Sequence, residues 1–393
     1  MSPLARTALR IRVLVTLCRP AVAVLFALYA ALGLAQAGQA ERPLLLARCL
    51  VPVVAFLLCS VCVNDLSDQA VDRVNLAGDS SRPLVTGVAG ARDLVVTAVT
   101  AGAVALAAAF LLGPRPGLVM AAALVLSAGY SLRPVRFADR GAVAALVLPA
   151  CYVALPYLLA LTATGHGIGP RDLLMLAGLY AGFVGRIVLK DFRDVRGDAL
   201  FGKRTFLVRH GRRATCLFSA CFWSVGCGVI LLATPSRTPV LIASYALCLG
   251  AVLLILRTLA GDVGHREEEA LITGVAAIGR GLLTLQLTHL AVGQAGWSAP
   301  ASSAAVGALT LLALAQAYVM VRNGPRTNLT LASLPPHAPE ALPADPTAPA
   351  LPADLADPAA PALPADPASP ALPALPAGPR RPAPALAERL KKT

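Results

Sequence analysis

The sequence predicts an all-α membrane protein, a polytopic bundle of nine or ten transmembrane helices. Three observations predict this fold class. Apolar residues make up 57% of the chain and charged residues 14%, and the mean hydropathy is +0.70, whereas about a quarter of the residues in a typical soluble domain are charged. The apolar residues gather in long blocks, and roughly 20 of them in a helix span the hydrocarbon of a bilayer. The basic residues gather in every second loop between the blocks.

Ten segments are long and apolar enough to be expected as transmembrane helices. They lie at residues 20–38, 44–63, 94–113, 116–132, 141–163, 170–190, 214–234, 238–259, 271–293 and 301–321. The ninth segment carries Arg280, Gln286 and His289, so it could instead be partly re-entrant or interfacial. Its polar residues fit hydrogen bonding between helices better than catalysis.

The net charge of +13 is distributed in a way that indicates a membrane rather than nucleic acid. Loops rich in Lys and Arg alternate with loops that are poor in them, which is the pattern that places basic loops on the cytoplasmic side. The basic residues of the rich loops are Arg6, Arg10, Arg12 and Arg19 before the first segment, Arg73, Arg82 and Arg92 after the second, Arg133, Arg136 and Arg140 after the fourth, and Lys190, Arg193, Arg196, Lys203, Arg204, Arg209, Arg212 and Arg213 after the sixth.

Two acidic stretches lie at the ends of the second and sixth segments, and both are therefore expected to face the cytoplasm. Each contains three aspartates spaced i, i+3, i+7, which would share one face of a continuous helix. The two trios are Asp65, Asp68 and Asp72, and Asp191, Asp194 and Asp198. Three carboxylates on one face repel one another unless a cation lies between them, and Mg²⁺ commonly bridges carboxylates to substrate phosphates. The pattern predicts that the two trios hold Mg²⁺ ions around one diphosphate.

Basic and aromatic residues near the two stretches are candidates for binding that diphosphate. Arg186 lies within the sixth segment, where a cation is costly unless it faces a polar cavity. Lys203 and Arg204 follow the second stretch and can act as cationic donors to phosphate. Arg136 could be either a topology anchor or a phosphate ligand, and Tyr130 either an interfacial aromatic residue or part of the site.

The composition changes abruptly after the last apolar segment. The hexapeptide Ala-Leu-Pro-Ala-Asp-Pro occurs at 341–346 and again at 362–367. Frequent proline blocks helix formation, and alanine and aspartate offer little apolar surface to bury. We therefore expect a transmembrane domain at 1–322 and a disordered Pro/Ala-rich tail at 323–393, either cytoplasmic or external.

The motifs resemble those of the UbiA-type intramembrane prenyltransferases, the family that includes 4-hydroxybenzoate polyprenyltransferases. The likeness covers roughly residues 12–321. It is carried by the first acidic stretch with the Arg-Pro-Leu-Val-Thr-Gly at 82–87, by Tyr130-Ser131 with Pro134 and Arg136, and by 190–198 with Gly202. The resemblance implies helices around a central cavity and an enzyme that transfers a prenyl group, an alkyl group other than methyl, from a prenyl diphosphate with Mg²⁺ as cofactor.

The resemblance also implies a role for each candidate residue. The six aspartates would hold the Mg²⁺ ions and act as the catalytic set. Substrate binding would fall to Asn64, Arg82, Tyr130, Arg136, Arg186, Lys190, Lys203 and Arg204. The cationic members would neutralise the leaving diphosphate while an allylic cation forms in an apolar cavity that excludes water.

The acceptor is left open by these residues. An aromatic ring in quinone or meroterpenoid synthesis is the favoured acceptor, and transfer to a lipid or sugar phosphate or cyclisation of the prenyl chain are the alternatives. A secondary transporter is the alternative from another class, and it predicts charges near the middle of the bilayer. We expect an integral protein of a bacterial plasma membrane whose site faces the cytoplasm, and whose partners are the bilayer, a prenyl diphosphate and a small-molecule acceptor. Neither nucleic acid nor a protein partner is implied.

Overall fold

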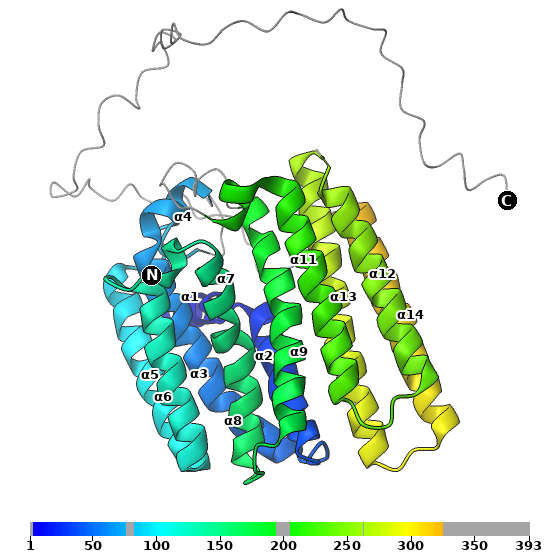
Figure 1. Ribbon diagram of the computed structural model, residues 1–393. Helices are drawn as coiled ribbons and strands as arrows, with labels where there is room; N and C mark the ends of the chain where they lie inside the picture. Colours follow the sequence, from blue (N-terminus) through cyan, green and yellow to red (C-terminus); the bar gives the residue numbers. More distant parts are fainter. Residues whose placement is uncertain (1–2, 76–81, 194–204, 262, 325–393) are drawn as a thin grey trace, which may run out of the picture. The chain divides into compact units, whose positions relative to one another are not determined.

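Proline begins many of the helices, at a position where its missing N–H costs no hydrogen bond. The computed structural model describes residues 3–75, 82–193, 205–261 and 263–324. All regular structure in these ranges is helical, as predicted (Figure 1). The α-helices are α1 (Pro3–Leu17), α2 (Pro20–Gln36), α3 (Pro43–Ser67), α4 (Gln69–Asn75), α5 (Ala91–Leu112), α6 (Pro114–Ser131), α7 (Ala142–Pro149), α8 (Leu155–Ala163), α9 (Pro170–Ile187), α11 (Phe206–Ala233), α12 (Pro239–Leu259), α13 (His265–Gln294) and α14 (Ala299–Asn323).

Three short elements join or extend these helices. The 3₁₀ turn η1 spans Phe137–Asp139, the π-helical turn η2 spans Ala150–Ala154 between α7 and α8, and the 3₁₀ turn η3 spans Val188–Lys190 at the end of α9. Through η2, the two short helices α7 and α8 form one apolar run over Val143–Ala163.

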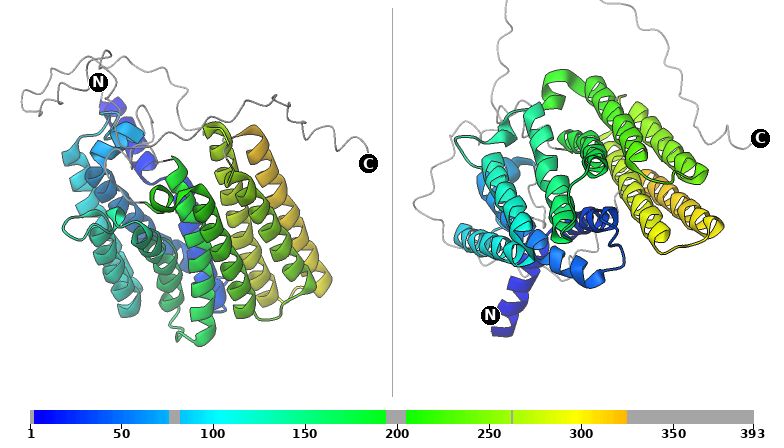
Figure 2. Two further views of the ribbon diagram at one scale, coloured as in Figure 1. Left: turned by 45° about the horizontal axis from the view of Figure 1, so that its top comes forward. Right: turned by 60° about the horizontal axis from the view of Figure 1, so that its bottom comes forward.

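All ten segments predicted to span the membrane are helical. Eight of them are long and apolar enough to cross a bilayer, and the described residues give nine if the bent pair of α1 and α2, which meet at 55°, counts as one span (Figure 2). The fourth predicted segment, α6, begins with Pro114-Arg115-Pro116 and falls outside this set. The ninth predicted segment is not broken, since it forms the 30-residue helix α13.

The helices lie side by side, and the closest neighbours are α9 with α11, α13 with α14, and α3 with α5 (Figures 1 and 2). Glycine allows the closest of these contacts: a Cβ on Gly226 of α11 would lie 2.7 Å from the backbone nitrogen of Gly182 in α9. Small residues let backbones approach where lipid gives no hydrophobic drive to helix association. This contact fixes the position of α9, which carries the second acidic stretch at its end.

Polar residues of α13 bind neighbouring helices, as predicted for the ninth segment. Tyr245 of α12 donates to Gln286, and Gln286 donates to Thr234 at the end of α11. At its far end, Gln294 accepts from the backbone N–H of Ala40 and donates to the carbonyl of Ala35. Gln294 thereby ties α13 to the end of α2, across a sequence separation of 254 residues.

Candidate functional site

Three arginines neutralise the three aspartates of the first acidic stretch. Arg19 Nη2 lies 2.8 Å from Asp65 Oδ1. Arg82 also pairs with Asp65, and its Nη1 lies 3.3 Å from Asp72 Oδ2. We call the six residues of this cluster the arginine–aspartate network; its members are Arg19, Asp65, Asp68, Asp72, Arg82 and Arg136.

Arg136 completes the network from the loop after α6. Its Nη2 lies 2.7 Å from Asp68 Oδ1, and its Nη1 donates to the carbonyl of Ser67 at 3.1 Å. Asn64 donates to the other oxygen of Asp68 at 2.9 Å. The predicted residues Asn64, Arg82 and Arg136 thus all lie with the first trio.

The prediction that the first trio shares one continuous helical face is wrong. Helix α3 ends at Ser67, Asp68 occupies the C-cap position with φ −103° and ψ 10°, and Asp72 lies on the separate helix α4. The i, i+3, i+7 spacing places side chains on one face only while the helix continues. Asp65 and Asp72 are nevertheless joined, because both contact Arg82.

Two arginines of the network have a left-handed backbone. Arg19 has φ 43° and Arg136 has φ 36°, and Ser236 is the third non-glycine residue with positive φ among those the structure describes. This conformation is costly for a residue with a Cβ, and such strain is concentrated at functional sites. Arg19 is the N-cap of α2, separated from the end of α1 by Cys18, so it lies at the bend between the two helices, and its side chain reaches Asp65.

The second acidic stretch begins at η3. Lys190 ends this turn, and the side chain of Asp191 is buried, with 8% of it exposed. The predicted residues Asp194, Asp198, Lys203 and Arg204 lie outside the described residues.

Two tyrosines lie between the described parts of the acidic stretches, Tyr130 buried and Tyr152 half-buried. Tyr130, at the end of α6, is within electrostatic reach of Asp68 and also of Lys190 and Asp191. Tyr152, in η2, is within electrostatic reach of Arg19 and Asp65 and also of Lys190. The described parts of the two stretches therefore face the same pair of phenols.

Burial shapes the electrostatics of Asp72, which lies outside the spanning segments. Loss of solvent raises the pKa of its carboxyl to about 6, and the positive charge of Arg82 opposes this rise. Burial removes water that would stabilise the negative charge of this carboxylate. The charged form of Asp72 is therefore favoured only while a cation such as Arg82 lies beside it.

The donor chemistry of the network fits a hard divalent ion. Asp65, Asp68 and Asp72 offer carboxylate oxygens, which Mg²⁺ prefers. Among the described residues, no three His, Cys, Asp or Glu side chains are arranged to hold a metal ion, and the carboxylates face guanidinium groups instead. The arginine side chains compensate the charge of these aspartates in the structure.

Arg186 lies apart from the network. Its guanidinium carbon lies 5.8 Å from the ring centre of Phe183, and it lines a cavity enclosed by α2, α9, α11, α12 and α13. Within the described ranges it has no ion pair with an aspartate. Sequence reasoning missed Arg19, because a basic residue before a first span is typical of any membrane protein.

The chain belongs to the UbiA prenyltransferase family, whose model matches residues 23–273. The predicted family, and with it the enzyme class, is confirmed at that level. The chain is 28% identical to the bacteriochlorophyll synthase 34 kDa chain of Chloroflexus aurantiacus over 40% of this chain, and it spans half the length of that relative. It is 27% identical to digeranylgeranylglyceryl phosphate synthase of Methanothermobacter thermautotrophicus, over 56% of this chain and 80% of the relative.

Solved structures resemble this chain to different degrees. One, described as digeranylgeranylglyceryl phosphate synthase in membranes, has a TM-score of 0.53 at 14% identity and covers 70% of this chain and 97% of that one. A UbiA homolog from Archaeoglobus fulgidus, solved with DMAPP and Mg²⁺ bound, has a TM-score of 0.46 at 17% identity and covers 78% of this chain and 98% of that one. The helical intramembrane fold is confirmed, and the chain is an integral membrane protein.

Proposed function

We propose that the chain transfers a prenyl group from a prenyl diphosphate to a small-molecule acceptor, with the diphosphate bound between the two acidic stretches. The observation that supports this proposal is that Asp68 and Asp191 are both within electrostatic reach of Tyr130, although they lie more than a hundred residues apart in the chain. Acidic groups from two helix ends, set among arginines, suit a ligand that carries both metal ions and negative charge.

The aspartates of both stretches would hold Mg²⁺, including Asp194 and Asp198 from outside the described residues. When bound, the ions supply Lewis-acid stabilisation of the charge that grows on the leaving diphosphate. The chain's own contribution is to fix these carboxylates at one end of the bundle. Asn64 assists by holding one oxygen of Asp68.

The arginines of the network have a second role in this proposal. Arg19, Arg82 and Arg136 neutralise the aspartates in the structure, and a guanidinium can bind phosphate oxygens in the same bidentate manner as carboxylate. These arginines, with Lys190, Lys203 and Arg204, would bind the diphosphate directly.

Aromatic rings lie where an allylic cation would form. The Tyr152 ring lies 5.1 Å from the Phe26 ring and 5.6 Å from the Phe183 ring, measured between centres. As the carbon–oxygen bond breaks, the diphosphate leaves with the electron pair, and ring faces stabilise the cation that remains. A nucleophilic atom of the acceptor then bonds to that carbon, and the acceptor loses a proton.

The acceptor is proposed to be an aromatic ring, as in quinone synthesis, with a glyceryl phosphate lipid as the alternative. The two curated relatives are named for different products, a bacteriochlorophyll and a digeranylgeranylglyceryl phosphate, so both classes belong in the test. We place the protein in a bacterial plasma membrane with the site facing the cytoplasm, on the basis of the alternating basic loops.

The test uses the full chain in lipid nanodiscs with a radiolabelled prenyl diphosphate, Mg²⁺, and a panel of aromatic and glyceryl phosphate acceptors. The proposal expects a labelled product that requires Mg²⁺ and that EDTA abolishes. Unchanged donor with every acceptor, together with ion-coupled uptake in sealed vesicles, would overturn it in favour of a transporter.

A further inference from the structure

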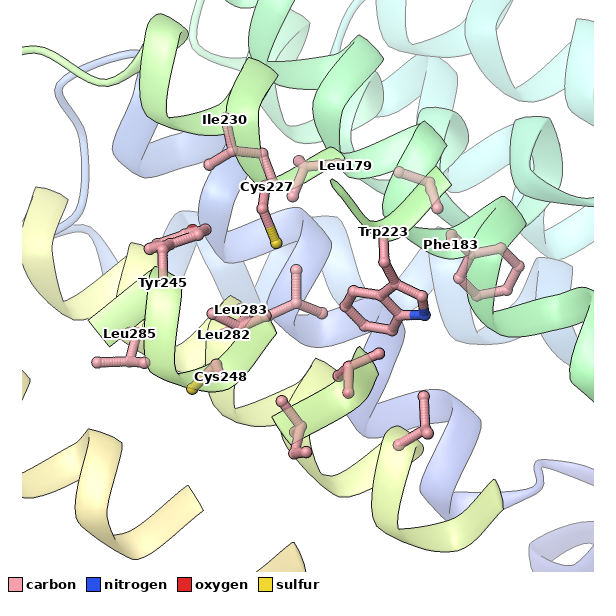
Figure 3. Close-up of a cluster of buried hydrophobic side chains, with 14 of the residues drawn as sticks. Leu179, Phe183, Trp223, Cys227, Ile230, Tyr245, Cys248, Leu282, Leu283 and Leu285 are labelled. Carbon is pink, nitrogen blue, oxygen red and sulfur yellow. The ribbon is translucent and has the colours of Figure 1, made fainter. Parts of the chain in front are cut away.

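A cavity separate from the arginine–aspartate network lies between α2, α9, α11, α12 and α13. Its volume is about 40 Å³, so an occupant larger than a few waters requires side chains of its wall to move. Leucine, isoleucine and aromatic side chains make up most of its wall, among them Leu179, Phe183, Ile230, Leu282 and Leu283 (Figure 3). An apolar wall of this kind suits a hydrocarbon or an aromatic ring.

Two cations interrupt that wall. Arg186 enters from α9 and Arg280 from α13, and the two guanidinium groups are close enough to repel each other, with Arg193 adding to the repulsion. Within the part of the chain that the structure describes, neither Arg186 nor Arg280 has a carboxylate partner. We call this space the arginine cavity. Unpaired cations inside a membrane bundle are costly and mark functional sites by default.

A neutral donor in the same wall also lacks a partner. Trp223 is 5% exposed, and its indole Nε1–H has no hydrogen-bond acceptor in the described structure. Glycines hold the indole in place, since a Cβ on Gly185 would lie 2.9 Å and one on Gly279 3.0 Å from its ring atoms. Buried donors are almost always satisfied in folded proteins. The indole N–H shows that polar groups in this wall lack partners, and the two guanidinium groups that line the cavity indicate a ligand that carries negative charge.

We propose that the arginine cavity binds the acceptor through an anionic head, a carboxylate or a phosphate monoester, while the apolar part of the acceptor contacts the leucine and aromatic wall. This inference rests on the proposed function and names the class of its second substrate. A prenyl chain is a poorer occupant, because hydrocarbon would leave both cations without partners.

The position of the cavity suits an acceptor. Arg186 lies four residues before Lys190, at the end of the same helix, and Tyr152 is within electrostatic reach of both. Tyr152 therefore lies between the arginine cavity and the network. An acceptor with its anionic head at Arg186 and Arg280 would direct its other end toward Tyr152, where the allylic carbon is expected.

The chain provides its own reporter for a binding test, because it has two tryptophans. Trp297 is 54% exposed. In the Trp297→Phe variant, Trp223 is the one remaining tryptophan, so the tryptophan emission of the protein comes from Trp223. This protein in nanodiscs is titrated with two anionic probes, benzoate and octyl phosphate, and with their neutral counterparts, benzyl alcohol and octanol, with empty nanodiscs subtracted. We expect at least one anionic probe to change the Trp223 emission saturably and its neutral counterpart to bind at least tenfold more weakly.

Substitutions of single arginines in the Trp297→Phe protein test which positive charge binds the anionic probe. Arg280→Gln should weaken the anionic probe at least tenfold, and Arg280→Lys should keep affinity within about threefold. Arg257→Gln, an exposed arginine on α12, should leave the titration unchanged. Arg186→Gln provides a second measurement if Arg280→Gln yields no folded protein. Equal binding of neutral and anionic probes, or unchanged binding in the glutamine variants, would overturn the inference.

Release of diphosphate from the prenyl diphosphate is measured in a separate assay. The proposed function and the proposed acceptor site can then fail independently. A protein that binds the anionic probe but never releases diphosphate from a prenyl diphosphate would overturn the proposed function and keep the anion site. A protein that transfers the prenyl group with the same KM for the acceptor in Arg280→Gln as in the wild type would overturn the arginine cavity as the acceptor site.

Discussion

The arginine–aspartate network and the arginine cavity contain the same cation in opposite surroundings. In the network, each guanidinium contacts at least one aspartate, and Asp65 accepts from both Arg19 and Arg82. In the cavity, Arg186 and Arg280 face each other and an aromatic wall, without a carboxylate from the described residues. In the network the positive and negative charges compensate each other without a ligand. In the cavity the two positive charges are not compensated by a described carboxylate.

This difference separates two ways of preparing for a charged substrate. Under the proposed function the network would exchange partners, since its arginines would leave the aspartates to bind phosphate and its aspartates would then bind metal ions. The cavity gains a first partner when an anion enters. Charge complementarity in the network stabilises the free protein, while the charge in the cavity favours the bound state.

The largest effect should come from breaking the network's acidic side. Asp68→Asn and Asp191→Asn keep side-chain size but each remove one anionic oxygen ligand, and we expect prenyl transfer to fall by about 10²-fold or more, the scale of losing one electrostatic stabiliser. The measurement is initial rate over a Mg²⁺ titration. Glu41→Gln, in the exposed loop between α2 and α3, is the matched control and should leave the rate unchanged. Near-normal turnover in both aspartate variants at low Mg²⁺ would show that these groups do not hold the metal.

A smaller loss should follow from removing Arg19. Arg19→Gln takes one of two cations from Asp65 and leaves Arg82 in place, so we expect about a tenfold lower rate, less than a full stabilising contact is worth. Arg10→Gln, an exposed arginine of α1, tests whether basic charge before the first span matters in general. Equal losses of transfer rate in the two variants would show that Arg19 contributes only to membrane topology.

Stability should distinguish the two regions directly. Arg82→Gln leaves Asp65 and Asp72 buried with less positive charge, so the free energy of unfolding should fall by about 3–5 kcal/mol, which is the range for breaking a buried ion pair. Arg280→Gln removes a cation that has no such partner and relieves its repulsion with Arg186, so thermal stability should stay equal or rise. Melting temperatures of the two variants in one detergent give the comparison, and a lower melting temperature for Arg280→Gln would indicate an unrecognised partner.

The smallest effect concerns the region outside both sites. Deleting the chain after Asn323 should leave insertion and prenyl transfer unchanged, because the Pro/Ala-rich tail lacks apolar content to pack against helices. Expression, monodispersity and specific activity of the truncated chain are the measurements. A truncated chain that fails to insert would assign the tail a structural role.

The spans were predictable because bilayer thickness and helical rise set the length of each apolar run. The ends of the helices were less so: the spacing of Asp65, Asp68 and Asp72 gave no sign that α3 ends at Ser67. The pairing of Arg19 with Asp65, across 46 residues, depends on how α1 and α2 bend. Trp223 lies on α11 and Arg280 on α13, and no sequence motif links the two positions. The sequence therefore gave no indication that both residues line one cavity.

The contacts of Gln294 with Ala35 and Ala40 also constrain how the chain is made. During synthesis α2 enters the membrane long before α13 emerges, and domains generally fold from the N-terminus as the chain emerges. Until then the backbone groups at the end of α2 must use other partners, such as water at the interface. The bundle closes with this late, high-contact-order step. A nascent chain stalled before residue 265 would hold the complete arginine–aspartate network, whose last member is Arg136, without the α13 wall of the arginine cavity.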